Sequence, residues 1–297
     1  MPLDPEVAAL LERQKGQPPR SSLSVADTRQ RLRDAGALAG PPPSLALVED
    51  LHLPGLPPAR HYSPTTEAGQ PVVLFFHGGR FFSGDLESHD TVCRLLAISA
   101  ACRVIAVDYR LAPEHPFPAA AEDACRALQW ASDQGVPVAI AGDSAGANLA
   151  AVAALAHPTP ALRCQVLIYP MLDPQGSSPS YAEYADGYGP GAIDMQRGWT
   201  LYLPPGTNPR DPLASPLYAA DTSGQPPALI LTAECDTLRD EGEAYASKLI
   251  ESGNPVQLRR YPGTIHGFFT MPGTLSVARE AIHDVAAFLR LHLGPAH

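Results

Sequence analysis

The sequence predicts an α/β protein with a mostly parallel sheet that is covered by helices on both faces. Short apolar runs recur along the chain, and helical stretches separate most of them. Runs that are apolar throughout are typical of parallel strands buried on both sides, and their alternation with helices points to the same architecture. A chain of 297 residues is long enough to bury a large core in one domain.

The chain begins with two segments that are predicted as amphipathic helices. The first covers residues 4–14 and carries its apolar residues on one face. The second covers residues 24–38, with Ser24 placed to cap its N-terminus. The proline run at residues 40–44 then ends the helical pattern.

The segments with strand character follow. The first two are expected at an edge of the sheet, and the others form its centre. In chain order they are residues 45–54, 59–64, 71–79, 103–110, 136–144, 163–172, 226–236 and 255–263. The helices between the central strands are expected at residues 90–100, 118–135 and 145–157.

One connection is much longer than the rest. Residues 173–225 are rich in Tyr, Gly and Pro, and residues 192–204 within them have helical character. A connection of this length is more often functional than a plain loop. We therefore expect a helical cap over the C-terminal edge of the sheet, made of residues 1–44 and 173–214. The catalytic core is then made of residues 45–172 and 215–297.

Composition excludes several classes of protein. The net charge of -10 argues against nucleic-acid binding, which needs clustered Lys and Arg. The N-terminus lacks the pattern of a signal peptide, and no apolar run approaches the roughly 20 residues that span a bilayer. Five cysteines without a Cys-x-x-Cys motif favour reduced thiols, so we expect a cytoplasmic location.

A Gly-x-Ser-x-Gly motif, Gly142 to Gly146, lies between the strand at 136–144 and the helix at 145–157. This strand–turn–helix context is what a nucleophile elbow requires. The alternative is a glycine-rich turn that only joins a strand to a helix. The context favours Ser144 as a nucleophile, with the helix N-terminus directing N–H groups toward developing negative charge.

A serine hydroxyl needs a base and a carboxylate behind that base. Asp236 and His266 each follow a strand, at the edge where parallel sheets gather functional groups. Their order after Ser144 fits a Ser-Asp-His triad, in which Asp236 orients His266. Asp240 and Glu234 are rival acids close to Asp236. The rival histidines lie in proline-rich loops or in the last helix, namely His115, His157, His283 and His292.

The segment "FFHGGRFFSGD" (75–85) resembles the glycine-rich loop that supplies oxyanion donors. The candidate donors are the backbone N–H groups of Gly78, Gly79, Arg80 and Ala145. His77 is expected to brace this loop by hydrogen bonding.

A metal site is a weaker interpretation of the same region, because its residues match no known ligand spacing. We therefore predict no metal and no cofactor. The residues of that alternative are His77, Asp85, His89 and Asp90.

These motifs together resemble the hormone-sensitive lipase family of esterases, the bacterial family IV carboxylesterases. The resemblance covers about residues 45–291. It rests on the segments "HGGRFFSGD", "DYRLAPEHPFPAA", "GDSAGANLA", "PALILTAECDTLRDEGEAYASKL" and "YPGTIHGF". It implies an eight-stranded α/β-hydrolase sheet with a cap, and hydrolysis of short- to medium-chain acyl esters through an acyl-enzyme intermediate, without a cofactor. The nucleophile, acid and base of the family fall on Ser144, Asp236 and His266.

Two positions depart from the family pattern. Arg80 stands where a third glycine is usual, and Thr237 stands where proline is usual. Either the Arg80 side chain turns into the pocket, where it suits a carboxylate, or it is a solvated surface arginine. The expected substrate contacts are Arg80, Phe81, Tyr188 and Trp199, although most cap aromatics are expected only to hold the cap to the sheet.

Other functions are compatible with this fold. A relative that lacks the catalytic histidine serves as a small-molecule receptor, but the intact set of Ser144, Asp236 and His266 favours an enzyme. Hydrolysis of an amide, or deacetylation of a specific small molecule, uses the same groups. The expected partner is a small-molecule ester, and a homodimer is one possible assembly.

Overall fold

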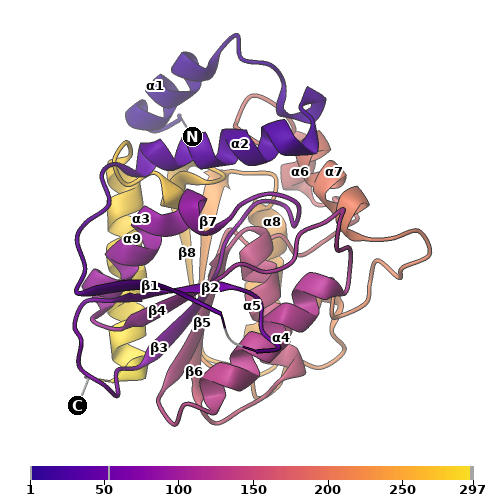
Figure 1. Cartoon of the computed structure of the whole chain (residues 1–297). Coiled ribbons are helices and arrows are strands. Elements are labelled where there is room, and N and C mark those ends of the chain that lie inside the picture. Colours follow the sequence, from indigo (N-terminus) through magenta and orange to yellow (C-terminus); the bar gives the residue numbers. More distant parts are fainter. Residues whose placement is uncertain (1, 53, 295–297) are drawn as a thin grey trace.

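The computed structural model of the chain describes residues 2–52 and 54–294. Residue 1 of the predicted cap, and residues 53 and 295–297 of the predicted core, lie outside the described residues. A single eight-stranded sheet runs through the middle of the molecule, with strand order β1-β2-β4-β3-β5-β6-β7-β8 (Figure 1). β2 is antiparallel to both of its neighbours, and all other neighbouring strands from β4 to β8 are parallel. The predicted fold class is confirmed.

The strands agree with the segments predicted from apolar runs. Several runs are too long at their C-terminal ends, namely 45–54, 71–79, 103–110 and 163–172. In the last of these the strand ends at Ile168 and the chain turns at Tyr169, which has φ 36°. The strands are β1 (Leu47–Leu51), β2 (Ala59–Ser63), β3 (Val72–Phe76), β4 (Arg103–Val107), β5 (Val138–Asp143), β6 (Leu162–Ile168), β7 (Ala228–Cys235) and β8 (Val256–Ile265).

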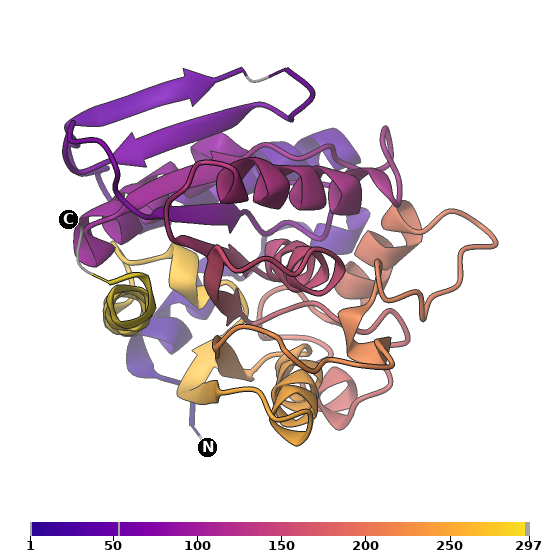
Figure 2. The same cartoon turned by 90° about the horizontal axis from the view of Figure 1, so that it is seen from below.

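Helices cover both faces of the sheet (Figure 2). The apolar core on one face joins the strands to α4 (Ala119–Ser132), α5 (Ala145–Ala156) and α8 (Arg239–Glu251). The core on the other face joins them to α3 (Leu86–Ala100) and α9 (Ser276–Leu293). Successive residues of β3 contribute to opposite cores, which explains why this strand is apolar throughout.

The N-terminal helices form as predicted. They are α1 (Pro5–Gln14), which buries Val7 and Leu10, and α2 (Val25–Ala35), which Ser24 caps by accepting the Asp27 N–H. Between β6 and β7 lie α6 (Pro179–Glu183) and α7 (Ala192–Tyr202), so the predicted helix in this long connection is also present.

The N-terminal segment and the long connection meet at one end of the sheet (Figure 1). Arg197 of α7 donates to the carbonyl of Arg20 at 3.4 Å. Arg29 of α2 donates to the carbonyl of Phe82 at 2.8 Å, in the loop that follows β3. The long connection thus contacts the N-terminal segment, which in turn contacts the loop after β3.

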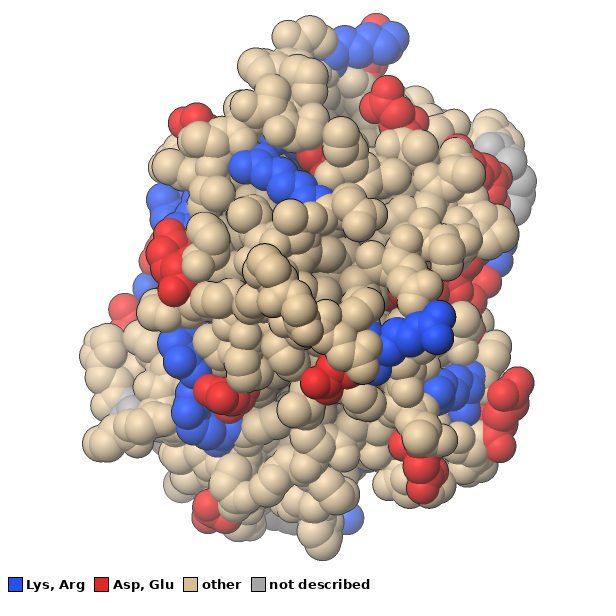
Figure 3. Space-filling view, turned by 90° about the vertical axis from the view of Figure 1, so that its right-hand side faces the viewer, with Lys and Arg blue, Asp and Glu red and all other residues tan. Residues whose placement is uncertain are grey.

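Surface and thiol features agree with the composition. All five cysteines are free thiols, and four of them are buried. On the face that Figure 3 shows, basic and acidic side chains are scattered among uncharged ones, so the coloured residues of this face form no continuous basic track. Within residues 2–52 and 54–294, none of the helices has the length and apolar character needed to cross a bilayer.

Candidate active site

Ser144 lies on a sharp turn between β5 and α5. Its backbone has φ 55° and ψ -119°, a conformation that costs a non-glycine residue about 1–3 kcal/mol. A Cβ on Gly146 would lie 1.9 Å from the carbonyl oxygen of Phe76, and a Cβ on Gly142 would lie 2.4 Å from Gly146. Both motif glycines are therefore required by close backbone contacts, and the turn presents Ser144 at the end of the sheet.

Three side chains from three strand ends form one chain of hydrogen bonds. The Ser144 Oγ lies 3.0 Å from Nε2 of His266, and Nδ1 of His266 lies 2.8 Å from Oδ2 of Asp236. Oδ1 of Asp236 accepts the Leu238 N–H at 2.9 Å. With exposed fractions of 2%, 7% and 1% for Ser144, His266 and Asp236, the set is shielded from water. This geometry suits transfer of the serine proton to His266.

The rival carboxylates bind elsewhere. Glu234 accepts the Gly263 N–H at 2.7 Å. Asp240 accepts the Ser180 N–H at 2.8 Å and pairs with Arg239, also at 2.8 Å. Among the rival histidines, His157 caps the end of α5, and His283 and His292 lie in α9. Only Asp236 among these three carboxylates is paired with His266 in the described structure.

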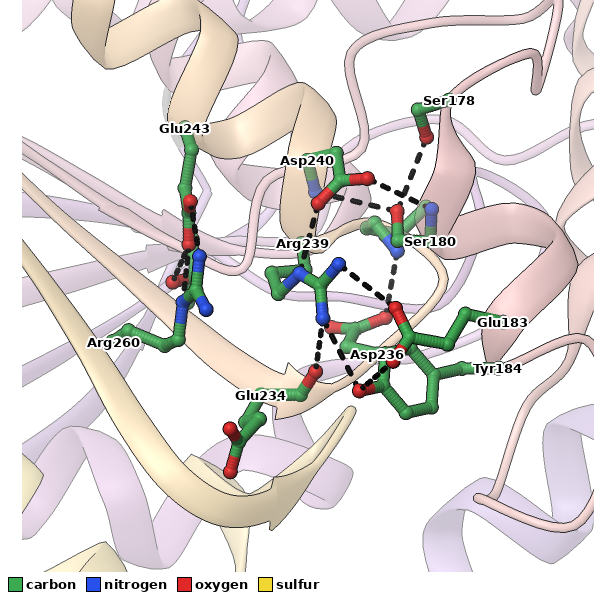
Figure 4. Close-up of polar contacts among 12 residues, drawn as sticks. Ser178, Ser180, Glu183, Tyr184, Glu234, Asp236, Arg239, Asp240, Glu243 and Arg260 are labelled. Atoms are coloured by element: carbon green, nitrogen blue, oxygen red, sulfur yellow. Dashed lines mark hydrogen bonds and ion pairs between the residues drawn. The ribbon is translucent and has the colours of Figure 1, made fainter. Parts of the chain in front are cut away.

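The loop that carries Asp236 is anchored to α6 (Figure 4). The buried Ser180 Oγ donates to the carbonyl of Thr237 at 2.6 Å. Arg239 donates to Glu183 at 3.1 Å and to the Tyr184 hydroxyl at 3.2 Å. The long connection is thus tied to the residue that follows Asp236, at the position where the resembling family usually has proline.

The loop after β3 and the start of α5 offer backbone donors beside Ser144. Within the described residues, the N–H groups of Gly79, Arg80 and Ala145 donate to no protein acceptor. Ala145 is the first residue of α5, where an N–H has no partner within the helix. The N–H of Gly78, in contrast, is donated to Oδ1 of Asp143 at 2.7 Å. The expectation that Gly78 is an oxyanion donor is therefore wrong.

Asp143 is a residue that our sequence analysis missed. Nε2 of His89 lies 3.1 Å from Oδ1 of Asp143, the oxygen that also accepts the Gly78 N–H. Burial would raise the pKa of Asp143, but His89 and the Gly78 N–H offset this and hold the pKa below its usual value. A buried carboxylate thus fixes the loop after β3 to the turn at Ser144. The only sequence signal was its position inside "GDSAG".

His77 braces the same loop, as expected. Its Nδ1 lies 2.9 Å from the carbonyl oxygen of Gly78, and its ring stacks on Tyr109 with centroids 4.4 Å apart. The Tyr109 hydroxyl donates to the His77 carbonyl at 2.7 Å. Burial, and to a smaller extent the neighbouring His89, lowers the pKa of His77 to about 4, so the His77 ring is neutral at pH 7. Within the described part of the chain, no group of His, Cys, Asp and Glu has the arrangement of a metal site.

Arg80 and Phe81 both have positive φ, 57° and 64°, a region that favours the glycine usual at position 80. Only 8% of Arg80 is exposed, so the alternative of a solvated surface arginine is wrong. The Phe81 ring stacks on Tyr202 with centroids 3.9 Å apart and contacts Trp199 at 5.0 Å.

Tyr188 packs against Tyr184 with ring centroids 5.1 Å apart. Both tyrosines lie in the long connection, whereas the contacts of Phe81 with Trp199 and Tyr202 join that connection to the core. A substrate contact for Phe81, Tyr188 or Trp199 stays a prediction.

Comparison with known proteins extends these observations. A family model described as the alpha/beta hydrolase fold matches residues 73–270. The carboxylic ester hydrolase LipN of Mycobacterium tuberculosis is 40% identical, over 83% of this chain and 70% of its own. The ethyl acetate hydrolase of Pseudomonas putida is 36% identical, over 99% of this chain and 100% of its own.

Solved structures agree with these relatives. A hyperthermophilic esterase from the archaeon Pyrobaculum calidifontis superposes with a TM-score of 0.89 at 38% identity, covering 99% of this chain and 100% of its own. An alpha/beta hydrolase enzyme from the metagenome of Lake Arreo superposes with a TM-score of 0.92 at 38% identity, covering 99% of each chain.

Proposed function

The chain belongs to the alpha/beta hydrolase fold family, in the branch that resembles hormone-sensitive lipase. From this premise we propose that it is a serine carboxylesterase that acts on short- to medium-chain acyl esters. Curated relatives across most of its length are ester hydrolases, and this chain is a carboxylic ester hydrolase. The finer proposal rests above all on the hydrogen-bond chain from Ser144 through His266 to Asp236.

In the first half of the proposed reaction, His266 accepts the proton of Ser144 while the serine Oγ bonds to the ester carbonyl carbon. The negative charge that develops on the carbonyl oxygen is stabilised by the N–H groups of Gly79, Arg80 and Ala145. Removing one such donor typically costs about 3 kcal/mol in other enzymes. The intermediate collapses when the alkoxide leaves with the proton held by His266, and an acyl group remains on Ser144.

In the second half, a water molecule replaces the alcohol. His266 accepts its proton, and the water oxygen bonds to the acyl carbon. The proton returns from His266 to Ser144 as the acid leaves. Asp236 stabilises the cationic ring in both halves and holds Nδ1–H toward itself.

The segments 1–44 and 173–214 form a cap in this proposal. The packing of α7 over the loop after β3 supports it, because Phe81, Trp199 and Tyr202 are at most 3% exposed and leave little room for extension. A closed apolar site of this kind favours short acyl chains. The partner is a small-molecule ester, and deacetylation or amide hydrolysis would use the same groups.

We expect p-nitrophenyl butyrate to be cleaved with a kcat/KM that exceeds that of the palmitate ester by roughly tenfold or more, because a long chain does not fit under the cap. A series from acetate to palmitate, measured with purified protein, tests this. The Ser144→Ala protein, prepared in the same way, measures contaminating activity. Equal cleavage of palmitate and butyrate esters would remove the role given to the cap.

We expect kcat/KM to rise with pH on the acidic side of neutrality, because His266 accepts the serine proton only when its ring is neutral. A pH profile from 5 to 8 with p-nitrophenyl butyrate tests this. His266→Asn should lose nearly all activity together with this rise. The matched variant His283→Asn, on the exposed side of α9, should keep both. A flat wild-type profile contradicts the role of His266.

A further inference from the structure

The guanidinium group of Arg80 is buried without a matching acceptor. Its nearest carboxylate oxygen, Oδ1 of Asp194 in α7, lies 3.7 Å from Nη1, too far for a good hydrogen bond. Both of these atoms are fully buried and have no hydrogen-bond partner among the described residues. Burial lowers the pKa of Arg80 to about 10, so the group is still charged at pH 7. A buried cation with incomplete hydrogen bonding is costly unless a ligand completes it.

Other arginines surround this group. Arg197 and Arg80 both place their guanidinium groups over the Phe82 ring, at 5.2 and 5.0 Å from its centroid. Arg197 also donates to the Arg20 carbonyl. Electrostatic repulsion from Arg20, Arg197 and Arg31 contributes to the low pKa of Arg80. We call this set the arginine cluster: Arg20, Arg31, Arg80 and Arg197.

Negative charge near the arginine cluster is too small to balance it. In the described parts of the chain, the only carboxylate within 4 Å of any of these guanidinium groups is Asp194 beside Arg80. Arg31 donates instead to the Pro18 carbonyl and to the Gln17 side chain. None of the four arginines is fully exposed, so water screens their repulsion incompletely.

The arginine cluster is also next to the proposed chemistry. The backbone N–H of Arg80 is one of the proposed oxyanion donors, while its Cβ lies under α7, where a Cβ on Gly198 would come within 2.7 Å of it. The guanidinium group is therefore no farther from the reacting carbonyl than one extended arginine side chain plus one hydrogen bond. An anion held there is near enough to be part of the same small molecule as the ester.

We propose that the arginine cluster binds a carboxylate of the substrate, so that the preferred substrates are half-esters of short dicarboxylic acids. This inference rests on the proposed function. A planar guanidinium fork suits a carboxylate, which would supply the missing acceptor and offset the excess positive charge. Ser144 takes the acyl group, the alcohol leaves with the proton from His266, and water then releases the dicarboxylate.

The test compares ethyl hydrogen succinate with its uncharged isostere, ethyl 4-methylpentanoate, by pH-stat at pH 8. The wild-type enzyme should prefer the anionic ester, and Arg80→Gly should lower the ratio of kcat/KM for the anionic ester to kcat/KM for the neutral ester on the order of 10- to 100-fold. Glycine suits the positive φ of position 80 and retains the backbone donor. Arg197→Met is a second variant that leaves the oxyanion loop intact. Arg126→Met is the control and should alter neither ester, since Arg126 is a half-exposed residue of α4 that pairs with Asp123 of the same helix.

A binding measurement separates this inference from the proposed function. Glutarate should bind to the Ser144→Ala protein in a calorimetric titration. The double variant, which also carries Arg80→Gly, should bind glutarate more weakly. With the wild-type enzyme, glutarate should compete with p-nitrophenyl butyrate. Cleavage of the neutral ester without preference for the anionic one overturns the inference alone. Non-competitive binding of glutarate also overturns it. Hydrolysis of neither ester by a folded enzyme contradicts the proposed function instead.

Discussion

Replacing Ser144 with alanine is expected to lower kcat for p-nitrophenyl butyrate on the order of 10⁴- to 10⁶-fold, because no other group takes over the covalent step. The fold should survive. The Ser144 Oγ contacts His266 at 3.0 Å, and alanine removes only this one atom from the turn. Because the substitution removes only this one hydrogen bond, we expect a small change in the free energy of unfolding. Circular dichroism and thermal unfolding, measured beside the activity, test both statements.

The control for this substitution is Ser247→Ala. Ser247 is exposed on α8, where its hydroxyl donates to the Glu243 carbonyl within the same helix. This variant should keep wild-type activity. Substantial residual turnover by a folded Ser144→Ala protein, above that of a mock purification, would contradict the assignment of Ser144 as the nucleophile.

Asp236→Asn is expected to lower kcat on the order of 10⁴-fold, because an amide next to Nδ1 favours the wrong tautomer of His266 and does not stabilise its cation. The side chain of Asp236 is 1% exposed and accepts the Leu238 N–H with its other oxygen. Asparagine retains an acceptor for that bond, so the loss should fall on kcat rather than on folding. Steady-state kinetics with p-nitrophenyl butyrate provide the measurement.

Asp240→Asn is the matched variant, since it makes the same change of atoms four residues later, in the first turn of α8. Asp240 binds the Ser180 N–H and Arg239, and both contacts serve the anchoring of α6. Its substitution should weaken that anchor and spare most of kcat. The opposite ranking of the two variants, with Asp240→Asn the more damaged, would mean that Asp236 is not the acid of the triad.

Much of the site was predictable from the chain because its signals are local. The turn at Ser144 follows from two glycines within two residues of it, and the structure shows the backbone contacts that require them. Asp236 and Glu234, in contrast, both lie at the end of one strand, and the sequence alone left them as rivals. Their difference depends on β8, since Glu234 binds the Gly263 N–H of that strand and Asp236 faces His266 beyond its end.

The loop after β3 shows the same division between local signals and distant contacts. The glycine-rich segment was recognisable, but the inclusion of Gly78 among its donors was wrong. The partner of the Gly78 N–H is Asp143, 65 residues away in the chain. No local pattern reports such a pairing, because it depends on how β3 and β5 lie side by side.

The sequence by itself determined the fold class, the order of the strands and helices along the chain, and Ser144, Asp236 and His266 as the catalytic candidates. Apolar periodicity, helix caps and turn glycines are properties of neighbouring residues, so they can be recognised in the chain alone. Only the tertiary structure decided which carboxylate faces His266, which N–H groups are available to an oxyanion, and that Arg80 is buried under α7. These outcomes depend on contacts between segments distant in sequence. The residues that pack around a side chain set where it points and which charged groups lie near it.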